Sequence, residues 1–315
     1  MAAVCAKNIN MAHTDVQKPP KGPRHWISWL AVGLLWLLGR LPPRLGLLLV
    51  SPLGPLTYHL MASRRKIAQR NIERCFPELN AAEREEILRG GFRSLARMLV
   101  ETAWVWSAPM EKLATRIRIE GLENLRDAEE LGRGVLVLTF HTTCVEMGGL
   151  MLSSKTRASG IYRPLKNPVI EWYQNRGRLR LAEHLIKKDN PRRAIRILNK
   201  GGVVWYAPDQ DFGADQTAFA PFFGIQTSTL LATRRFPALT GCAVVPMFPR
   251  YEKDSGMYVM TVFPALDNFP SDDALADLTR VNAIMEEQIR KVPEQYWWIH
   301  RRFKTRPEGE PPFYD

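Results

Sequence analysis

His141 and Glu146 are the residues of this sequence best suited to chemistry, because a buried strand is predicted just before them. Residues 134–140 form the short apolar run that predicts this strand, and the residues after Glu146 are compatible with a helix. Side chains five positions apart on one helix diverge by about 140°, so the two can pair only if His141 ends the strand and Glu146 lies in the first helical turn. Glu146 would then accept the proton of one ring nitrogen and leave the other to take a proton from a hydroxyl. The alternative is a helix-capping His beside a solvated Glu.

Strand and helix patterns alternate along the chain and are expected to position this pair. Apolar runs predict strands at residues 115–120, 135–140, 159–162, 203–207, 243–248 and 258–263. Periodicity and helix-start signals predict helices at residues 81–106, 142–153, 168–185, 191–198, 229–236 and 273–291. This order predicts an α/β fold, with a largely parallel or mixed sheet flanked by helices.

Asp209 and Gln210 follow another strand-like run. Pro208 is expected to end that strand, so Asp209 and Gln210 would face the same cleft as His141. We expect Asp209 to hold an arginine or substrate hydroxyls in place. A metal site at Asp209 and Asp211 is disfavoured, because two acids with no nearby His ligand rarely suffice, and no metal is predicted.

From about Ser63 to its C-terminus, the chain resembles the lipid A biosynthesis acyltransferases, the lauroyl and myristoyl transferases of Gram-negative bacteria. The matching blocks occur in order at residues 70–77, 92–95, 141–146, 162–168, 177–180, 204–213, 221–224, 244–246 and 298–307. The block Ala-Pro-Asp-Gln-Asp and the block His-Arg-Arg-Phe-Lys-Thr-Arg-Pro are the most specific. The family signature often carries Asp at the position of Glu146, and Glu can reach the same ring nitrogen with one extra methylene.

The resemblance implies a glycerolipid-acyltransferase-like α/β domain that moves a fatty acyl chain from an acyl carrier protein thioester to a hydroxyl of a Kdo-modified lipid A precursor. His141 would be the general base, while Glu146 would fix its tautomer and stabilise the imidazolium. The phosphopantetheine arm belongs to the carrier protein, so no bound cofactor is expected. A mechanistically different alternative makes Cys144 a nucleophile that forms an acyl-enzyme.

Further residues are candidates for binding the reacting groups. Arg178 is the first candidate for the donor that stabilises the thioester oxyanion, and Arg163 is the second. The alternatives for these residues are binding of substrate phosphates and a position on a solvated basic face. Phe223 would line an acyl tunnel or belong to an aromatic core cluster. Arg301 and Arg302 lie in a basic, aromatic segment that by composition alone suits single-stranded nucleic acid. Beside a membrane anchor, contact with anionic lipid headgroups is the better interpretation, so no nucleic acid partner is predicted.

Composition and the N-terminal residues indicate a membrane partner. The net charge of +12 favours an anionic partner, and the four scattered cysteines disfavour a disulfide framework or a zinc knuckle. We divide the chain into a polar leader at 1–25, a hydrophobic anchor or interfacial segment at 26–62, and an acyltransferase domain at 63–315. The uncharged run 26–38 would span only about 20 Å as a helix, against roughly 30 Å of hydrocarbon, so it is a thin span or lies in one leaflet. The alternative is a buried core helix. The resemblance implies the inner membrane, with the catalytic domain on its cytoplasmic face.

Two other functions remain open at this point. A lysophospholipid or glycerolipid acyltransferase would use the same His–acid chemistry on a different acceptor. A non-catalytic, basic membrane-lipid binder would not need His141 for its function.

Overall fold

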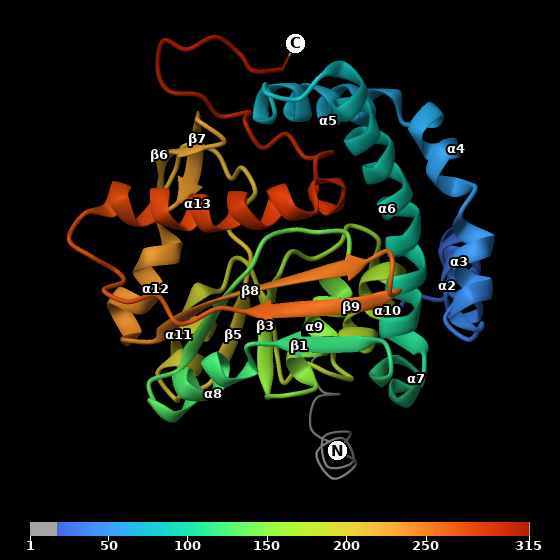
Figure 1. Cartoon of the computed structure of the whole chain (residues 1–315). Helices are drawn as coiled ribbons and strands as arrows, with labels where there is room; N and C mark the ends of the chain where they lie inside the picture. The colour runs from blue at the N-terminus through green and yellow to red at the C-terminus, as the bar shows by residue number, and fades with distance from the viewer. Residues whose placement is uncertain (1–17, 315) are drawn as a thin grey trace.

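Helices cover both faces of a mixed β-sheet in the computed structural model, which describes residues 18–314 (Figure 1). Within these residues the sheet has seven strands. In spatial order they are β1 (Ile117–Glu120), β9 (Met257–Val262), β8 (Ala243–Glu252), β2 (Val135–Leu138), β5 (Val203–Tyr206), β3 (Ala158–Tyr162) and β4 (Leu185–Lys187). Neighbouring strands are parallel except β8 and β9, which are antiparallel. The predicted α/β fold with a mixed sheet flanked by helices is confirmed.

Strand alternation divides the interior into two cores. In β2, Val135 and Val137 point into one core while Leu136 and Leu138 point into the other. The first core includes residues from α2 (Trp26–Leu38), α3 (Pro43–Val50), α8 (Leu122–Glu130), α9 (Val145–Ser153) and α10 (Pro168–Arg178). The second includes residues from α5 (Ala62–Cys75), α11 (Pro191–Leu198), α12 (Ala232–Thr240) and α13 (Ala274–Lys291). The long helix α6 (Ala81–Ser107) contributes to both cores.

The remaining described elements are short. They are η2 (Pro23–His25), α4 (Leu53–Leu60), α7 (Met110–Ala114), η3 (Pro293–Gln295) and a hairpin of β6 (Thr217–Phe222) and β7 (Ile225–Leu230). The hairpin was not predicted. Residues 229–236 were predicted to be helical, but residues 229 and 230 end β7 and the helix α12 begins at Ala232. The predicted helix 168–185 likewise ends at Arg178, and β4 begins at Leu185.

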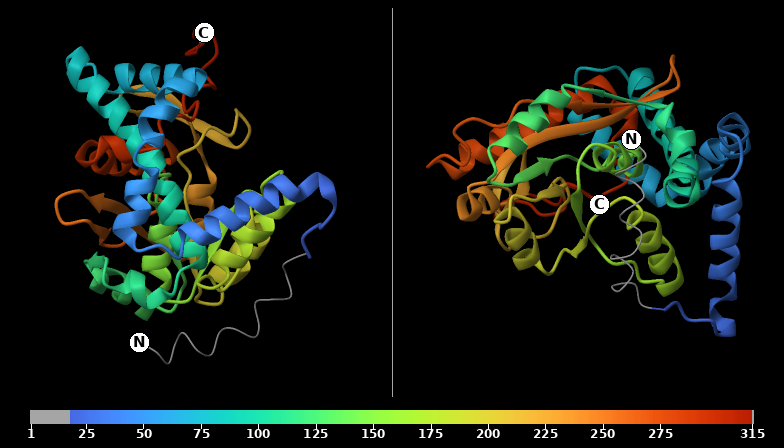
Figure 2. Two further views of the ribbon diagram at one scale, coloured as in Figure 1. Left: turned by 90° about the vertical axis from the view of Figure 1, so that its right-hand side faces the viewer. Right: turned by 90° about the horizontal axis from the view of Figure 1, so that it is seen from below.

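The N-terminal helices expose an apolar surface. Positions 1–17 of the predicted leader lie outside the described residues. The apolar run 26–38 is helical, as α2, and lies along α10 (Figure 2). Large apolar side chains on α2 to α4 are exposed: Trp26, Ile27, Leu30, Leu34, Leu37, Leu45, Leu48, Leu49, Leu56 and Leu60. In residues 18–314 no helix alone has the length and apolarity to cross a membrane, whereas the bent pair Pro43–Leu60 and Ala62–Cys75 does by length and composition.

Candidate active site

His141 and Asp209 follow neighbouring parallel strands at the same offset. Leu138 of β2 is paired with Tyr206 of β5, and His141 and Asp209 each lie three residues further along. The pairing continues past the strands, since Thr139 donates its backbone N–H to the Tyr206 carbonyl at 2.9 Å. Because parallel strands end at one edge of a sheet, this register brings the two side chains together. The structure places Asp209 beside His141, and its carboxylate holds His141 rather than the arginine that the sequence led us to expect; contact with substrate hydroxyls stays a prediction.

Asp209 holds both the ring and the backbone of His141. Its Oδ1 lies 2.7 Å from Nδ1 of the imidazole, and both carboxylate oxygens accept the His141 backbone N–H at 3.0 Å. The Asp209 side chain is 2% exposed, whereas that of His141 is 33% exposed. A carboxylate on Nδ1 keeps a proton there, so Nε2 carries the lone pair. No hydrogen bond from within residues 18–314 reaches Nε2, which leaves this atom able to accept a proton.

Electrostatics favour an ionised Asp209. Burial alone would raise the pKa of this carboxyl, but the charge and hydrogen bonds of His141, with a smaller effect of Arg302, lower it overall. Burial, and next the charge of Asp209, raise the pKa of the neighbouring Tyr296. Asp209 is therefore a buried anion that can stabilise a positively charged imidazole.

Glu146 does not pair with His141, which corrects the predicted contact. The backbone N–H of Thr143 bonds to the Gln295 carbonyl, so α9 begins only at Val145 and carries Glu146 in its first turn. There Glu146 accepts hydrogen bonds from the Trp106 indole at 2.9 Å and from Arg178 at 2.5 and 3.1 Å. The stretch 142–144 is thus a bridge and a turn rather than the predicted first helical turn.

Arg178 closes α10 and forms a close ion pair with Glu146. Its side chain is 27% exposed and that of Glu146 is 10% exposed. Burial alone would lower the pKa of Arg178, but the Glu146 carboxylate raises it, so the guanidinium stays charged. Glu146 bonds Nε and Nη2, while Nη1 makes no hydrogen bond to another described residue. A fixed cation with a spare donor is suited to a developing oxyanion or to a phosphate.

The other predicted site residues lie in different settings. Arg163 is exposed just after β3, and Gln210 is half-buried next to Asp209. Arg301 is exposed and stacks over the Tyr314 ring at 5.7 Å. Of these three residues, only Gln210 directly adjoins the His141–Asp209 pair.

Phe223 and Arg302 are buried rather than lining an open surface. Phe223 is 8% exposed in the β6–β7 turn, where its ring packs against Phe76 and Trp298. Arg302 is 2% exposed and donates from Nη1 to the Ser228 carbonyl at 2.6 Å. The structure therefore favours the aromatic-core interpretation for Phe223, and it corrects the expectation that Arg302 meets lipid headgroups at the surface.

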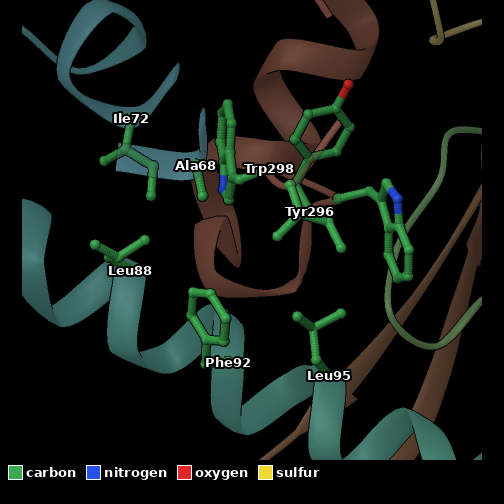
Figure 3. A pocket seen from close by; sticks show the side chains of 10 residues that line it. Ala68, Ile72, Leu88, Phe92, Leu95, Tyr296 and Trp298 are labelled. Carbon is green, nitrogen blue, oxygen red and sulfur yellow. The ribbon is translucent and has the colours of Figure 1, made fainter. Parts of the chain in front are cut away.

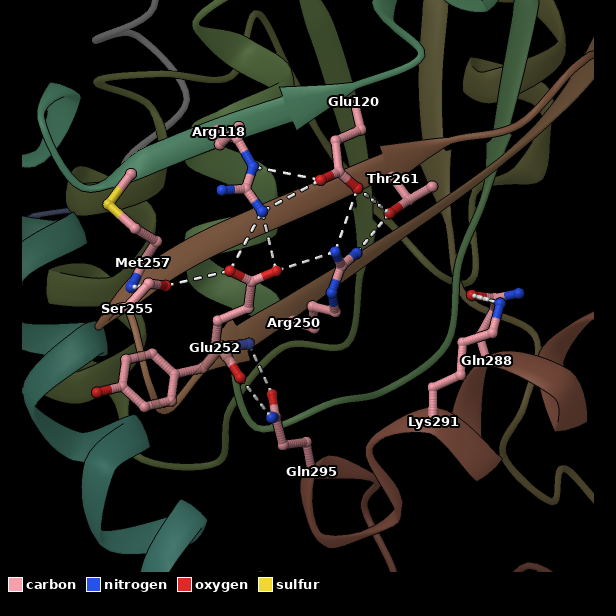
Figure 4. Close-up of polar contacts among 11 residues, drawn as sticks. Arg118, Glu120, Arg250, Glu252, Ser255, Met257, Thr261, Gln288, Lys291 and Gln295 are labelled. Atoms are coloured by element: carbon pink, nitrogen blue, oxygen red, sulfur yellow. Dashed lines mark hydrogen bonds and ion pairs between the residues drawn. The ribbon is translucent and has the colours of Figure 1, made fainter.

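The segment 295–298 lies beside His141 and is hydrogen-bonded to the loop that carries it. Trp297 donates its backbone N–H to the His141 carbonyl at 3.2 Å, and Thr143 bonds to the Gln295 carbonyl at 2.9 Å. The Gln295 amide in turn holds the backbone of Tyr251 in β8 through two hydrogen bonds of 2.8 Å (Figure 4). The loop that carries His141 is thereby fixed to the antiparallel end of the sheet.

Ion pairs lie on the surface of the sheet near the contact between Gln295 and Tyr251. Arg118 of β1 pairs with Glu252 of β8 at 2.9 Å, and Arg250 contacts Glu120 and Glu252 at 3.1 Å each (Figure 4). These side chains are all between a quarter and a half exposed, so each pair contributes little, about 0–1 kcal/mol.

His300 is a neighbour of the pair that the sequence analysis did not assign. Burial lowers its pKa to about 4, so the ring is neutral near pH 7. Its Nε2 accepts the backbone N–H of Asp211 at 3.0 Å. The Asp211 carboxylate binds both the backbone N–H and the hydroxyl of Thr305, at 2.7 and 2.8 Å. Hydrogen bonds therefore join the sequence block that carries Asp209 directly to the block that carries His300. The polar residues of these two blocks were the feature of the sequence that could have indicated this contact.

A small apolar pocket is lined on one side by the segment 295–298. Figure 3 shows Ile72, Leu88, Phe92 and Leu95 facing Trp298 across it. Its volume is about 10 Å³, room for roughly one water molecule. In this conformation the pocket does not accommodate an acyl chain.

Cys144 is fully buried, and burial raises the pKa of its thiol to about 12. Its Sγ lies 3.5 Å from the Pro249 carbonyl and 3.6 Å from Oε1 of Gln295. A thiol with so little thiolate character is a packing residue and a poor nucleophile. Among residues 18–314, no group of three or more His, Cys, Asp or Glu side chains is arranged to hold a metal ion, and the expectation of a metal-free site stays a prediction.

Comparisons with known proteins agree on one family. The family model described as "Bacterial lipid A biosynthesis acyltransferase" matches residues 14–305. The chain is 38% identical to the lipid A biosynthesis lauroyltransferase of Escherichia coli (strain K12), over 93% of this chain and 96% of that protein. It is 38% identical to the palmitoleoyltransferase of the same organism, over 93% and 95%. A solved 1-acyl-sn-glycerophosphate acyltransferase from Thermotoga maritima is 16% identical, over 84% of this chain and 97% of that chain, with a TM-score of 0.39.

Proposed function

The chain belongs to the bacterial lipid A biosynthesis acyltransferases and is an acyltransferase, and we propose that it moves a fatty acyl chain from an acyl carrier protein thioester to a hydroxyl of a Kdo-modified lipid A precursor. The position of the His141 ring against Asp209 is the observation that supports the proposed mechanism. Asp209 binds Nδ1 at 2.7 Å and leaves Nε2 with its lone pair at a partly exposed position. A neutral imidazole held in this way is a general base.

The proposed reaction is one acyl transfer in a ternary complex. Nε2 of His141 takes the proton of the acceptor hydroxyl as that oxygen attacks the thioester carbonyl carbon. Arg178 stabilises the oxyanion of the tetrahedral intermediate, and Asp209 stabilises the imidazolium. The C–S bond then breaks, an ester C–O bond remains, and the departing phosphopantetheine thiolate receives the proton from His141. The arm belongs to the carrier protein, so the proposal includes no resident cofactor or metal.

Glu146 is a positioning residue in this mechanism, because it holds Arg178 instead of His141. We expect Glu146→Gln to lower kcat by about 10–100-fold, since the amide keeps the shape but loses the charge that orients the guanidinium. Steady-state transfer rates measure this change. Glu183→Gln is the matched control, because Glu183 forms a partly exposed pair with Arg157 at 3.1 Å, and we expect wild-type rates. A loss as large as that of His141→Ala would contradict this role.

We expect Cys144→Ser to retain transfer within about twofold of wild type. The thiol is buried and protonated, and Ser can donate to the same carbonyl. Product formation and mass spectrometry of the protein after mixing with the thioester donor check this result. An acylated Cys144 in the wild type, lost together with activity in Cys144→Ser, would establish an acyl-enzyme instead.

The proposal places the protein at the inner membrane, with the catalytic domain on the cytoplasmic face. The exposed apolar side chains of α2 to α4 support an interfacial contact, because such a surface is unfavourable in water. The net charge of +12 is complementary to anionic lipid and to the acidic surface expected of an acyl carrier protein, and no nucleic acid is part of the proposal.

The experiment that tests the proposed function uses purified full-length protein in detergent. The Kdo-modified precursor is incubated with a panel of acyl carrier protein thioesters, and product masses are measured. We expect the mass of one acyl chain to be added, with one donor preferred. No transfer to this acceptor, together with transfer to a lysophospholipid, would overturn the assigned substrate.

A further inference from the structure

A second, larger pocket lies between α2 and α10, at the C-terminal end of α6. Its volume is about 520 Å³, within the range of small-molecule sites. Its walls include Trp29, Trp36, Arg40, Trp106, Arg176 and Arg180. Figure 2 shows α2 lying along α10 at the edge of the molecule, so the pocket is beside the exposed apolar helices.

The pocket is lined by positive charge without an acidic side chain. The Arg40 guanidinium stacks over the Trp36 ring at 4.7 Å, and that of Arg176 stacks over Trp172 at 5.4 Å. Within residues 18–314, neither Arg40 nor Arg176 forms an ion pair with a carboxylate, and both side chains are exposed to solvent. Stacking orients a guanidinium and leaves its N–H groups available to a bidentate anion such as a phosphate.

Tyr173 contributes an aromatic side chain to the pocket wall. The residue is 6% exposed, and its hydroxyl is buried. Burial raises the pKa of Tyr173 overall, while hydrogen bonding with the Ser107 side chain lowers it; the Ser107 hydroxyl itself donates to the Ala103 carbonyl at 2.6 Å.

Trp106 connects this pocket to the candidate active site. One part of its side chain lines the pocket, while its indole N–H donates to Glu146 at 2.9 Å. Glu146 in turn holds Arg178. Only the Trp106 side chain therefore separates a ligand in the pocket from Glu146, which holds the arginine that we assign to the oxyanion.

We propose that this pocket binds the anionic, phosphate-bearing end of the amphiphilic acceptor. The inference rests on the proposed function and specifies how its acceptor is held. The phosphate would meet Arg40 and Arg176, and the sugar rings would pack against the indole rings. The acyl chains would follow the exposed apolar side of α2, which includes Leu30 and Leu34. Wide aromatic walls with a few charged groups suit a sugar phosphate.

The test compares the double variant Arg40→Gln/Arg176→Gln with wild type at saturating donor. We expect KM for the phosphorylated acceptor to rise about 10–100-fold, with kcat changed less than about threefold, because the lost contacts are remote from the reacting atoms. For the dephosphorylated acceptor, we expect wild type and variant to differ less than about threefold. An unchanged KM, or an equal increase for both acceptors, would overturn the inference.

Arg192→Gln/Lys200→Gln is the matched control, because it removes the same charge from exposed positions in and just after α11. We expect its KM to equal that of wild type, and an equal rise in the control would mean that net charge alone acts. Both double variants replace exposed side chains, and their circular dichroism and melting temperatures verify folding.

A binding measurement separates this inference from the proposed function. The tryptophans in the pocket walls report on occupancy through their fluorescence. We expect detergent-dispersed phosphorylated acceptor to change the emission of wild type but not of Arg40→Gln/Arg176→Gln, and inorganic phosphate alone to bind at least tenfold more weakly. Equal binding of inorganic phosphate, or of the dephosphorylated amphiphile, would overturn the assigned ligand. If wild type binds the acceptor but transfers no acyl chain, the proposed function fails and the pocket assignment stands.

Discussion

Replacing His141 with Ala is expected to lower kcat for acyl transfer by about 10²–10⁴-fold, because the acceptor hydroxyl loses its general base. The KM for the acceptor is expected to change little, since His141 acts on a proton in the transition state rather than on the bound ground state. Rates with the preferred acyl carrier protein thioester measure both quantities.

The matched control for this prediction is His59→Ala, which removes an exposed histidine from α4. We expect its kcat to equal that of wild type. The His141 side chain is one-third exposed, so His141→Ala should fold normally and melt near the wild-type temperature. Transfer within threefold of wild type by a folded His141→Ala protein would rule out His141 as the base.

Replacing Asp209 with Asn is expected to lower kcat by about 10²–10⁴-fold, although Asp209 touches no reacting atom. The Asn oxygen would accept the backbone N–H of His141, so its NH₂ group would face Nδ1. An NH₂ group on Nδ1 favours the tautomer protonated on Nε2, which cannot take a proton from the acceptor. The variant also loses the anion that stabilises the imidazolium.

The pH dependence distinguishes this positioning role from a purely structural one. The pKa of Asp209 is lowered in the folded protein, so its stabilising effect is present above the ordinary pKa of Asp and is lost only as the pH falls through the lowered value. We therefore expect the titration of the Asp209 carboxyl to add no pH dependence to wild-type stability between pH 5 and 8, while Asp209→Asn lowers the rate throughout this range. A variant that unfolds, but keeps the wild-type rate per folded molecule, would contradict the assignment.

The sequence predicted the position of the pair because both members depend on short-range patterns. Residues 135–138 and 203–206 are apolar runs that become β2 and β5, and polar residues follow each run at the same distance. Parallel strands end at one edge, so Asp209 was expected in the cleft of His141. Its bond to Nδ1 was not predicted, because the spacing of His141 and Glu146 favoured another partner.

The environment of Glu146 depended on contacts that the sequence does not show. Trp106 lies forty positions before it and Arg178 thirty-two positions after it, on two different helices. The start of α9 is also set by the distant Gln295, through the bond to Thr143. Local periodicity cannot detect such pairing, and it likewise missed the β6–β7 hairpin, where Phe223 adopts a left-handed φ of 51°.

The central claim is that His141 and Asp209 act as one unit, and a double-mutant cycle on kcat tests it most directly. Transfer rates are measured for His141→Ala, Asp209→Asn and the protein that carries both changes. Because residues acting as a unit are not additive, we predict that the double variant is no slower than His141→Ala by more than about threefold. Losses that multiply, or an Asp209→Asn protein near wild type while Glu146→Gln is as slow as His141→Ala, would contradict the account and make Glu146 the partner of the base.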